Sequence, residues 1–565
     1  MSRSLLGAEC EWAVTGWDGR KVGAREQLVH EMLRAACQRF PHVRGTGGSS
    51  GIFFANGARF YIDCGLHPEM TTPECATPWE VARYIRAGER IMEELTREVQ
   101  SRSPRLEVVC ARCNVDYGGT GATWGCHTSF LHRANPSVLP DQIIPHLITR
   151  AVYTGAGGFN PHVPWPEFCV APRLLHIERV VSADSTGNRG IFHTKNETLS
   201  ADGYNRLHIL CGENLCSETA MVLMLGATAL VVAMAEGGLR PGAGLHLSAP
   251  LDALHTVARD PSCRAKLRLV QGGECTAIEI QHRMLELAER NLGALPPWAG
   301  ELCALWRRTL ARLEESPGAM SYTLDWAIKQ RLFASHAARR GVPFERFPQL
   351  QNMLAGLHEA LAKLPAAARS LRLAVLSGPA SPIPESSARC AAALAANGLT
   401  WDDLDRFLSL RDELYQLDIR FGQVGPRGIF GALERQDVLD HHVPGVDRIE
   451  EAMSMPPAEG RARIRGEVIR RLSGQPGATA CWQGVYIADG RVLDLNDPFA
   501  ATEIWTNPVP APQPDLPPPP DPLLEEILAA DPNRIQQALE ALRRRYGRTR
   551  ARPRRPTETP QGPDR

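Results

Sequence analysis

Hydrophobic and polar residues alternate in the segment GIFFANGARFYIDC, residues 51–64. A period of two is typical of half-buried strands, so this segment predicts a hairpin. From Pro78 to Val99 the period changes to that of a helix, with Ile91, Met92 and Leu95 at helical spacing. The pattern therefore predicts a strand hairpin that leads into a helix.

The same change of period occurs twice more along the chain. LEVVCARCNV (106–115) precedes a glycine-rich turn, and RLHILCG (206–212) precedes Ser217. Because strands and helices mix without strict alternation, we expect an α+β fold with an open, curved sheet rather than a doubly wound one.

Longer helical patterns follow elsewhere. Residues 25–40 have helical periodicity, and residues 301–433 are almost wholly helical in pattern. Residues 220–235 carry no charge, but they fall short of the roughly 20 apolar residues that span a bilayer, and Ser217 is a typical helix N-cap. We expect this segment to be a helix buried beneath the sheet.

The chain is longer than one hydrophobic core normally supports, so we expect more than one domain. Turn-rich residues 377–385 mark the centre of a helical insertion, and a polyproline run follows Trp505. The predicted parts are a catalytic domain (1–435) with the helical insertion (350–403), a small C-terminal domain (436–505), a proline-rich linker (506–522), and a tail that is helical and then arginine-rich (523–565).

Composition excludes some function classes. The 63 basic and 63 acidic side chains give a formal net charge of zero, which argues against a protein that mainly coats nucleic acid. A dense basic stretch, Arg543 to Arg555, belongs to the tail alone, which we interpret as a docking arm for a partner.

The cysteine pattern favours a reducing compartment. The opening segment MSRSLLGAEC lacks an apolar signal region, so the fifteen cysteines are expected to be mostly buried thiols in the cytoplasm. Only Cys110 and Cys113 have C-x-x-C spacing, without the second pair that a zinc site needs.

The first candidate chemistry comes from Glu9 and Glu11 in the segment GAECEW. In a strand, residues two apart point to the same face, and Arg59, Tyr61 and Asp63 have this spacing on a second predicted strand. Carboxylates on one face repel each other unless a cation lies between them, and Mg²⁺ is usually held by one or two carboxylates together with substrate phosphates. The pattern favours phosphoryl chemistry, although an E-x-E pair is more often simply solvated.

Several motifs together resemble one known family. They are GAECEW (7–12), NGARFYIDCGLHPEMTTPEC (56–75), NVDYGGTGATWGCH (114–127), NRLHILCGEN (205–214) with the Ser217-Glu218-Thr219 that follows, and RARIRGEVIRR (461–471). In order and spacing they resemble the Pup ligase and Pup deamidase (depupylase) family over most of residues 5–500. The resemblance implies a large glutamine-synthetase-like, carboxylate-amine ligase domain with a curved, mostly antiparallel sheet backed by helices.

The resemblance also implies roles at the matching positions. Glu9, Glu11 and Glu69 would hold Mg²⁺ beside the ATP phosphates, and Tyr61 would help to orient a metal-bound group. Asp63, at a strand end before a tight turn, would be the catalytic base or nucleophile. The residues implied to lie near the nucleotide or the acyl phosphate are His127, Arg173, Arg206, Glu218, Arg461, Arg463, Arg465 and Trp482.

These residue types also have ordinary structural alternatives. Tyr61 could equally pack in the sheet, and an Asp in a turn, such as Asp63, commonly accepts backbone hydrogen bonds. A run such as RARIRGEVIRR is usually one solvated helix face, and Trp482 could be a core residue. His67 and Pro68 are expected to shape the turn without touching substrate.

Three segments depart from the family pattern. TSF (128–130) stands where the family has Glu-Asn-Tyr, HTKNE (193–197) replaces Asn-Thr-Arg-Asp-Glu, and Thr198-Leu199 replaces Pro-His. Lys195 keeps a positive charge but loses the planar fork of arginine. Because these loops lie on the substrate side while the metal-binding acids are intact, we expect a divergent substrate rather than an inactive enzyme.

Three functions fit this site. A ligase would use ATP to phosphorylate the C-terminal Glu side chain of Pup or a Pup-like peptide, and a protein lysine would then displace phosphate. A deamidase or depupylase would hydrolyse an amide at the same site, and a non-catalytic module would only bind the tag.

Two features of the chain favour the ligase. The deamidase branch has a long insertion between its E-x-E and N-G-A-R strands, whereas only residues 13–55 intervene here. This short connection and the D-x-G-x-H-P-E pattern of residues 63–69 resemble the ligase branch.

Overall fold

The computed structural model describes residues 4–506, except for residues 19–22, 47–50, 64, 164, 197, 198, 200–202, 353–387, 389, 390, 393 and 397. The chain divides into a compact unit up to Asn507 and a second unit from Pro508 to Arg565, and every described residue belongs to the first. The predicted tail, nearly all of the predicted proline-rich linker and most of the predicted insertion therefore lie outside the described residues.

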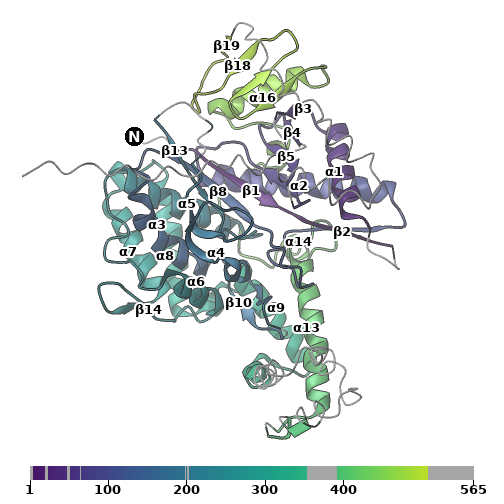
Figure 1. Ribbon diagram of the computed structural model, residues 1–565, viewed down its shortest axis with the longest axis vertical. Helices are drawn as coiled ribbons and strands as arrows, with labels where there is room; N and C mark the ends of the chain where they lie inside the picture. The colour runs from purple at the N-terminus through teal and green to yellow at the C-terminus, as the bar shows by residue number, and fades with distance from the viewer. Residues whose placement is uncertain are drawn as a thin grey trace, which may run out of the picture. The chain divides into compact units, whose positions relative to one another are not determined.

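An eleven-stranded sheet forms the centre of the first unit (Figure 1). Its order is β13-β8-β1-β6-β5-β4-β3-β16-β17-β18-β19, and all neighbouring pairs are antiparallel except β3 and β16. The predicted α+β class with a mostly antiparallel sheet is confirmed. The strands of this sheet are β1 (Leu6–Glu11), β3 (His42–Gly45), β4 (Gly51–Phe54), β5 (Arg59–Ile62), β6 (Pro68–Thr71), β8 (Cys126–His132), β13 (Asn205–Ile209), β16 (Thr479–Cys481), β17 (Gly484–Tyr486), β18 (Val492–Asp494) and β19 (Trp505–Thr506).

Four two-stranded ribbons accompany this sheet. One of them, β11 with β12, is parallel, and the other three are antiparallel. The ribbons are β2 (Ala13–Trp17) with β7 (Glu107–Ala111), β9 (Gly158–Phe159) with β10 (Phe168–Cys169), β11 (Arg179–Ser182) with β12 (Gly190–His193), and β14 (Leu267–Arg268) with β15 (Glu274–Cys275).

The period of two gives the sheet one apolar and one polar face. Ala8 and Cys10 of β1 and Phe60 of β5 are buried in the main core. Burying a side chain as large as Phe60 contributes about 2 kcal/mol. Glu9 and Glu11 alternate with these residues and therefore project from the opposite face. The hydrophobic effect thus fixes which face is left for chemistry.

Two long helices back the apolar face: α2 (Pro78–Arg102) contacts β1, α5 (Glu218–Glu236) contacts β8, and the two helices contact each other. At the start of α2, Thr77 and Glu80 form a reciprocal capping box. The hydroxyl of Ser217 accepts a hydrogen bond from the backbone N–H of Ala220 and caps α5, as the sequence predicts.

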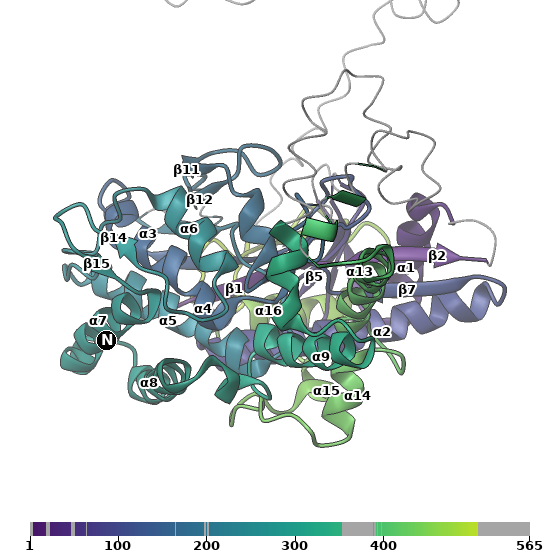
Figure 2. The ribbon, with the colours of Figure 1, turned by 90° about the horizontal axis from the view of Figure 1, so that it is seen from below.

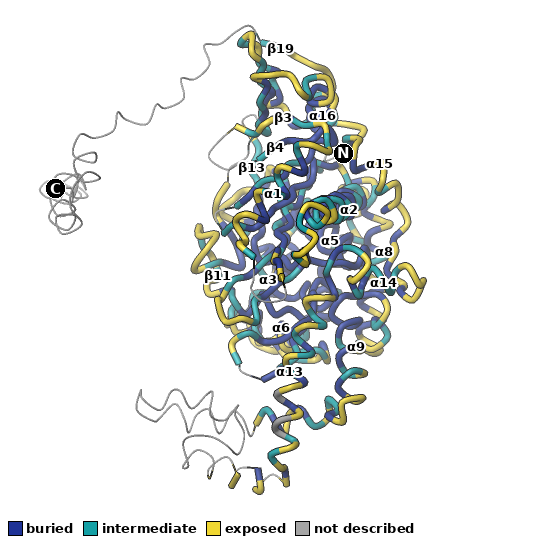
Figure 3. Tube along the Cα trace, turned by 90° about the vertical axis from the view of Figure 1, so that its right-hand side faces the viewer, coloured by how far each residue is buried: buried dark blue, intermediate teal, exposed yellow. Residues whose placement is uncertain are grey.

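The burial of α5 explains its unusual composition. Among the described residues it is the one helix long and apolar enough to cross a membrane, but 89% of its apolar window is buried inside the molecule. Figure 3 shows α5 in the buried interior. The prediction of a helix buried beneath the sheet is confirmed.

The other described helices pack around these two, and the described part of residues 301–433 is mostly helical, with short connections such as those at 321–324 and 422–428. Helices α9 and α13 lie side by side (Figure 2). The remaining helices are α1 (Arg25–Arg39), α3 (Leu139–Thr149), α4 (Ala151–Thr154), α6 (Pro250–Arg259), α7 (Ala277–Arg290), α8 (Ala299–Glu315), α9 (Asp325–Arg339), α13 (Trp401–Phe421), α14 (Ile429–Arg435), α15 (Ile449–Ala452) and α16 (Gly460–Leu472), with short 3₁₀ turns η1 (Pro172–His176), η2 (Leu292–Ala294), η3 (Pro317–Met320) and η4 (Phe344–Arg346).

The C-terminal strands continue the large sheet. Strand β16 pairs with β3, and a separate apolar cluster joins Val43 and Phe53 to Ile464 and Val485. Residues of the N-terminal strands, of α16 and of the C-terminal strands therefore pack together in this one cluster. The predicted boundary at residue 435 stays a prediction, because the sheet itself runs across both parts.

Candidate active site

Four residues that the sequence assigns to a metal meet on the polar face of the sheet. Glu11 of β1 lies directly opposite Glu69 of β6, and Glu69 lies opposite Tyr61 of β5. Glu9 lies one pair further along β1, opposite His127 of β8. Directly opposite residues in antiparallel strands have Cβ atoms about 4.5–5.5 Å apart. The strand register therefore brings the three carboxylates together.

The electrostatics of this group fit a bound cation. Burial and then the negative charges of Glu9 and Glu11 raise the pKa of Glu69 well above its ordinary value. Burial and the same acidic surroundings also raise the pKa of the Tyr61 hydroxyl, which donates a hydrogen bond to Glu69. Carboxylate and phenol oxygens are hard ligands, so the donor set and its mutual repulsion both suit Mg²⁺.

Asp63 lies at the end of β5, where the chain turns. One of its carboxylate oxygens, Oδ1, accepts hydrogen bonds from the backbone N–H groups of Gly65 (2.8 Å) and His67 (2.7 Å). The other, Oδ2, lies 3.3 Å from Nδ1 of His67. Burial favours the protonated form, but these hydrogen bonds outweigh it and lower the pKa of Asp63. The carboxylate is therefore held rigidly and ionised.

Arg173, on η1, supplies the positive side of the site. The side chain is buried, with Nη1 2.8 Å from the hydroxyl of Thr123 and 4.0 Å from the carboxylate of Glu11. Its Nη2 lies 3.4 Å from Nε2 of His127. A Cβ on Gly125 would lie 2.5 Å from the guanidinium carbon, so only glycine leaves room for this arginine.

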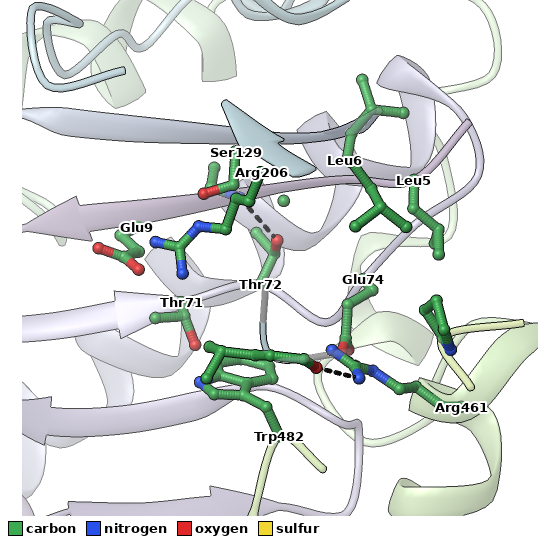
Figure 4. A pocket seen from close by; sticks show the side chains of 15 residues that line it. Leu5, Leu6, Glu9, Thr71, Thr72, Glu74, Ser129, Arg206, Arg461 and Trp482 are labelled. Carbon is green, nitrogen blue, oxygen red and sulfur yellow. Dashed lines mark hydrogen bonds and ion pairs between the residues drawn. The ribbon is translucent and has the colours of Figure 1, made fainter. Parts of the chain in front are cut away.

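A pocket continues from Glu9 along the same face (Figure 4). Arg206 of β13 reaches toward the Glu9 carboxylate from one side, and Trp482 lies at the other end with Arg461. Burial alone would raise the pKa of Glu9, but the hydrogen bond with His127 and the nearby charge of Arg206 lower it overall. The pocket thus joins an acidic end to a cationic and aromatic end, an arrangement that suits a nucleotide with its phosphates.

Comparison with known proteins identifies the family. Residues 6–359 and 392–486 match the family described as Pup-ligase protein. The chain belongs to the Pup-ligase family.

The alignment with this chain covers almost the whole length of each curated relative. The Pup–protein ligase of Kribbella flavida is 31% identical over 90% of this chain and 97% of the relative, and that of Geodermatophilus obscurus is 28% identical over 89% and 98%. The Pup–protein ligase of a Nocardioides species is 29% identical over 89% and 97%.

Solved structures agree on the fold. The complex between the prokaryotic ubiquitin-like protein Pup and its ligase PafA superposes with a TM-score of 0.67 at 24% identity, covering 88% of this chain and 90% of the PafA chain. PafA in complex with ADP gives a TM-score of 0.61 at 23% identity, covering 85% and 92%. The predicted Pup-ligase resemblance and the α+β fold with a large sheet backed by helices are confirmed.

In this Pup-ligase family member, the arginine run of α16 divides between two faces. Arg461 and Arg465, four residues apart, are both buried and pair with Glu74, at 2.6 Å for Nε of Arg461. The charges of Arg465 and Arg461 overcome the effect of burial and lower the pKa of Glu74 to about 2. Arg463 instead pairs with Glu467 at 3.0 Å on a more exposed surface. The structure therefore brings Arg461 to the pocket and points Arg463 away from it.

Trp482 is positioned by its neighbours in the same region. The guanidinium carbon of Arg465 lies 4.8 Å from the centre of the indole ring, and Phe53 contacts the ring edge-on with centroids 5.1 Å apart. The ring therefore packs against Phe53 and Arg465 and also lines the pocket, and its contact with a nucleotide stays a prediction.

Glu218 lies in a different cluster. Its carboxylate accepts a hydrogen bond from the backbone N–H of Val443 and lies 3.1 Å from Nδ1 of His442 and 3.7 Å from Nε of Arg86. Within the described residues these contacts come from α2 and from the segment after α14, not from the polar sheet face. The implied nucleotide contact of Glu218 is therefore not supported by its position.

Sequence reasoning missed three residues of the site. His67 contacts the Asp63 carboxylate, although we expected it only to shape the turn. Glu74 pairs with Arg461, and His208 lies with Glu9 and His127 in a group whose ligand atoms are within 4.8 Å of one another. The signal for His208 was its i, i+2 spacing from Arg206, whereas nothing in the local sequence links Glu74 to α16.

The departure at residues 128–130 falls on both faces of β8, whereas Leu199 of another departure lines the pocket. Ser129 lies on the polar face, where its hydroxyl is 3.1 Å from Nδ1 of His208. Thr128, its neighbour, is fully buried on the other face. Only Ser129 of these two can affect what the pocket binds. Thr198 lies outside the described residues.

Proposed function

We propose that this protein is an ATP- and Mg²⁺-dependent ligase that joins the C-terminal Glu of Pup, or of a Pup-like peptide, to lysine side chains of target proteins. The observation that carries the proposal is the carboxylate group Glu9, Glu11 and Glu69 beside Asp63 and Arg173, in a chain that belongs to the Pup-ligase family. The curated relatives carry the name Pup–protein ligase, and one similar structure is a PafA complex with ADP, which supports the use of ATP.

The reaction has two steps. In the first, an oxygen of the peptide's Glu side chain forms a bond to the γ-phosphorus of ATP, the bond to the bridging oxygen breaks, and ADP leaves with the electron pair. In the second, a lysine amine forms a bond to the acyl carbon, and phosphate leaves. The products are an isopeptide amide, ADP, phosphate and a proton.

The chain's own residues fit these steps. Glu9, Glu11, Glu69 and Tyr61 would hold Mg²⁺, which when bound neutralises phosphate charge. Asp63 is held ionised, so its carboxylate can attract the lysine ammonium and accept its proton.

The cationic residues and Trp482 would bind the phosphates and the nucleotide. Arg173 would grip phosphate oxygens through its planar fork, and His127 and Arg206 line the acidic end of the pocket. Arg461 and Trp482 would contact the nucleotide at the other end. The free, mostly buried cysteines of the described residues are consistent with a reducing, cytoplasmic setting. The partner of the tail stays a prediction.

A time course with Mg-ATP and two synthetic Pup-like peptides, one ending in Glu and one in Gln, tests the proposal by mass spectrometry. We expect ADP in proportion to peptide conjugated to a lysine donor, only with the Glu peptide. Conversion of Gln to Glu without matching ADP would establish the deamidase. Absence of Mg-ATP binding would favour the tag-binding module.

The Asp63→Asn variant serves as the internal control for the chemistry. The amide keeps one carbonyl oxygen to accept the turn's hydrogen bonds, but it cannot accept a proton. We expect Mg-ADP affinity within about threefold of the parent protein and conjugation lower by about a thousandfold, within the range for loss of a general base. Conjugation at the parent rate would show that the assigned role of Asp63 is wrong.

A further inference from the structure

Two arginines converge on one buried hydroxyl beside the candidate active site. Thr123 is 4% exposed, and its Oγ1 accepts hydrogen bonds from Nη1 of Arg173 and from Nη1 of Arg189. A hydroxyl oxygen has two lone pairs, so both are used by these bonds. The hydroxyl hydrogen is then left to donate to a third group.

The two guanidinium groups are an unfavourable pair by themselves. Burial and then the positive charge of Arg173 lower the pKa of Arg189, although arginine stays charged at any physiological pH. Glu11 has its Oε2 4.0 Å from Nη1 of Arg173, and it is also a predicted metal ligand. Together with Glu178 it acts against the lowering of the Arg189 pKa. The two guanidinium groups converge on one neutral hydroxyl, so an anion bound beside Thr123 would relieve their repulsion.

The two arginines come from different elements, and their backbones are held by different contacts. The backbone N–H of Arg173 donates to the buried carboxylate of Glu213 at 2.8 Å, and the other oxygen of Glu213 accepts from Ala156 at 2.6 Å, which fixes η1. Arg189 ends the exposed loop between β11 and β12. Its carbonyl accepts from the backbone N–H groups of Glu178 and Arg179, so its backbone is anchored while its side chain is only partly covered.

We propose that Arg189 is a catalytic residue that binds the transferred phosphoryl group together with Arg173 and Thr123. This inference rests on the proposed function and adds a contact that the sequence motifs do not assign. Both arginines donate to Thr123, and Arg173 lies 4.0 Å from the Glu11 carboxylate, so oxygens of a phosphoryl group bound beside Thr123 would meet the positive charge of both arginines. While the bond to the bridging oxygen breaks, the Arg189 fork would donate to the equatorial oxygens.

The first experiment compares Arg189→Gln and Arg189→Lys with the parent protein in ADP formation with the Glu-ending peptide. We expect kcat to fall about a hundredfold in Arg189→Gln, the usual scale for one transition-state donor, and Arg189→Lys to recover part of it. The affinity for Mg-ADP, which lacks the transferred group, should stay within about threefold. Arg179→Gln, an exposed position on the same ribbon, is the matched control and should leave kcat unchanged.

A second measurement does not depend on the peptide. Aluminium fluoride added to Mg-ADP imitates the phosphoryl group in transfer, and the parent protein should bind this combination more tightly than Mg-ADP alone. Arg189→Gln should lose at least about tenfold of that gain. If the gain is unchanged, or if Mg-ADP affinity falls as much as kcat does, the inference is wrong. If Arg189→Gln loses the tighter binding of Mg-ADP with aluminium fluoride, but the parent protein turns over neither peptide, the role of Arg189 is supported and the proposed substrate is contradicted.

Discussion

Two clusters of carboxylates in the described part of the molecule differ in their surroundings. One of them contains a buried arginine between its acids, and the other brings several acids close to Glu69. On the polar sheet face, Glu9, Glu11 and Asp63 all act to raise the pKa of Glu69. In the second cluster, Glu218 and Glu434 lie with His441 and His442 around the buried guanidinium of Arg86.

This difference indicates a structural role for the cluster around Arg86 and a ligand-binding role for the acids of the sheet face. Burial would lower the pKa of Arg86, but the charges of Glu89 and Glu434 raise it overall, so the second cluster satisfies itself. On the sheet face, His127 and Arg206 offset the charge of Glu9, but burial and the neighbouring acids still raise the pKa of Glu69, so a bound cation would stabilise the ionised group. Similar residue types therefore make a structural ion-pair network in one place and a candidate metal site in the other.

The largest expected effect comes from breaking the self-contained cluster. Arg86→Met would leave Glu218 and Glu434 buried without their cation, and removing one partner of a buried pair costs about 3–5 kcal/mol of the free energy of unfolding. Denaturant unfolding monitored by circular dichroism measures this loss. Arg90→Met, on the same helix but half-exposed beside Glu93, should cost less than about 1 kcal/mol. Equal costs for the two variants would contradict the comparison.

The opposite result is expected on the sheet face. Glu69→Gln removes one charge from a group of repelling carboxylates, so the metal-free protein should unfold at the same or a higher temperature. The Mg²⁺ concentration for half-maximal ADP formation should rise more than about tenfold, because a ligand is lost. Glu98→Gln, on the exposed side of α2, is the control for both measurements. A destabilised Glu69→Gln protein with unchanged Mg²⁺ demand would assign Glu69 to structure.

A smaller effect is expected at the turn that carries Asp63. The contact with His67 helps to lower the pKa of the Asp63 carboxyl, so His67→Ala should raise that pKa toward its ordinary value. A base with a higher pKa becomes protonated at higher pH. The acidic limb of the kcat/KM profile should therefore move to higher pH, which a set of rates across mildly acidic buffers measures. A shift to lower pH would contradict this role of His67.

The smallest effect is expected at Arg463. Because its guanidinium pairs with Glu467 away from the pocket, Arg463→Ala should leave the Mg-ADP affinity within about twofold. Arg461→Ala removes a buried charge that lines the pocket, and its affinity should fall about tenfold or more. Fluorescence titration with ADP compares them. Equal losses would mean that α16 acts as one unit.

Much of the site could be predicted from local spacing. The two-residue spacing in E-x-E placed Glu9 and Glu11 on one face. The arginine run was instead taken as one group, although the four-residue spacing of Arg461 and Arg465 puts them on one side of α16. The spacing did not separate Glu218 from the nucleotide residues, because its surroundings come from α2 and from residues near His442, which are distant in the chain.

The sequence by itself determined the hairpin of β4 and β5, the buried α5, the polar face and the family, because periodicity and motifs are local properties of the chain. Only the tertiary structure decided which charges meet across that face. The pairing of β1 with β6 brings Glu69 opposite Glu11, and the packing of α16 brings Arg461 to Glu74. These contacts depend on strand register and helix placement, which are set by burial of the whole core rather than by the spacing of any one motif.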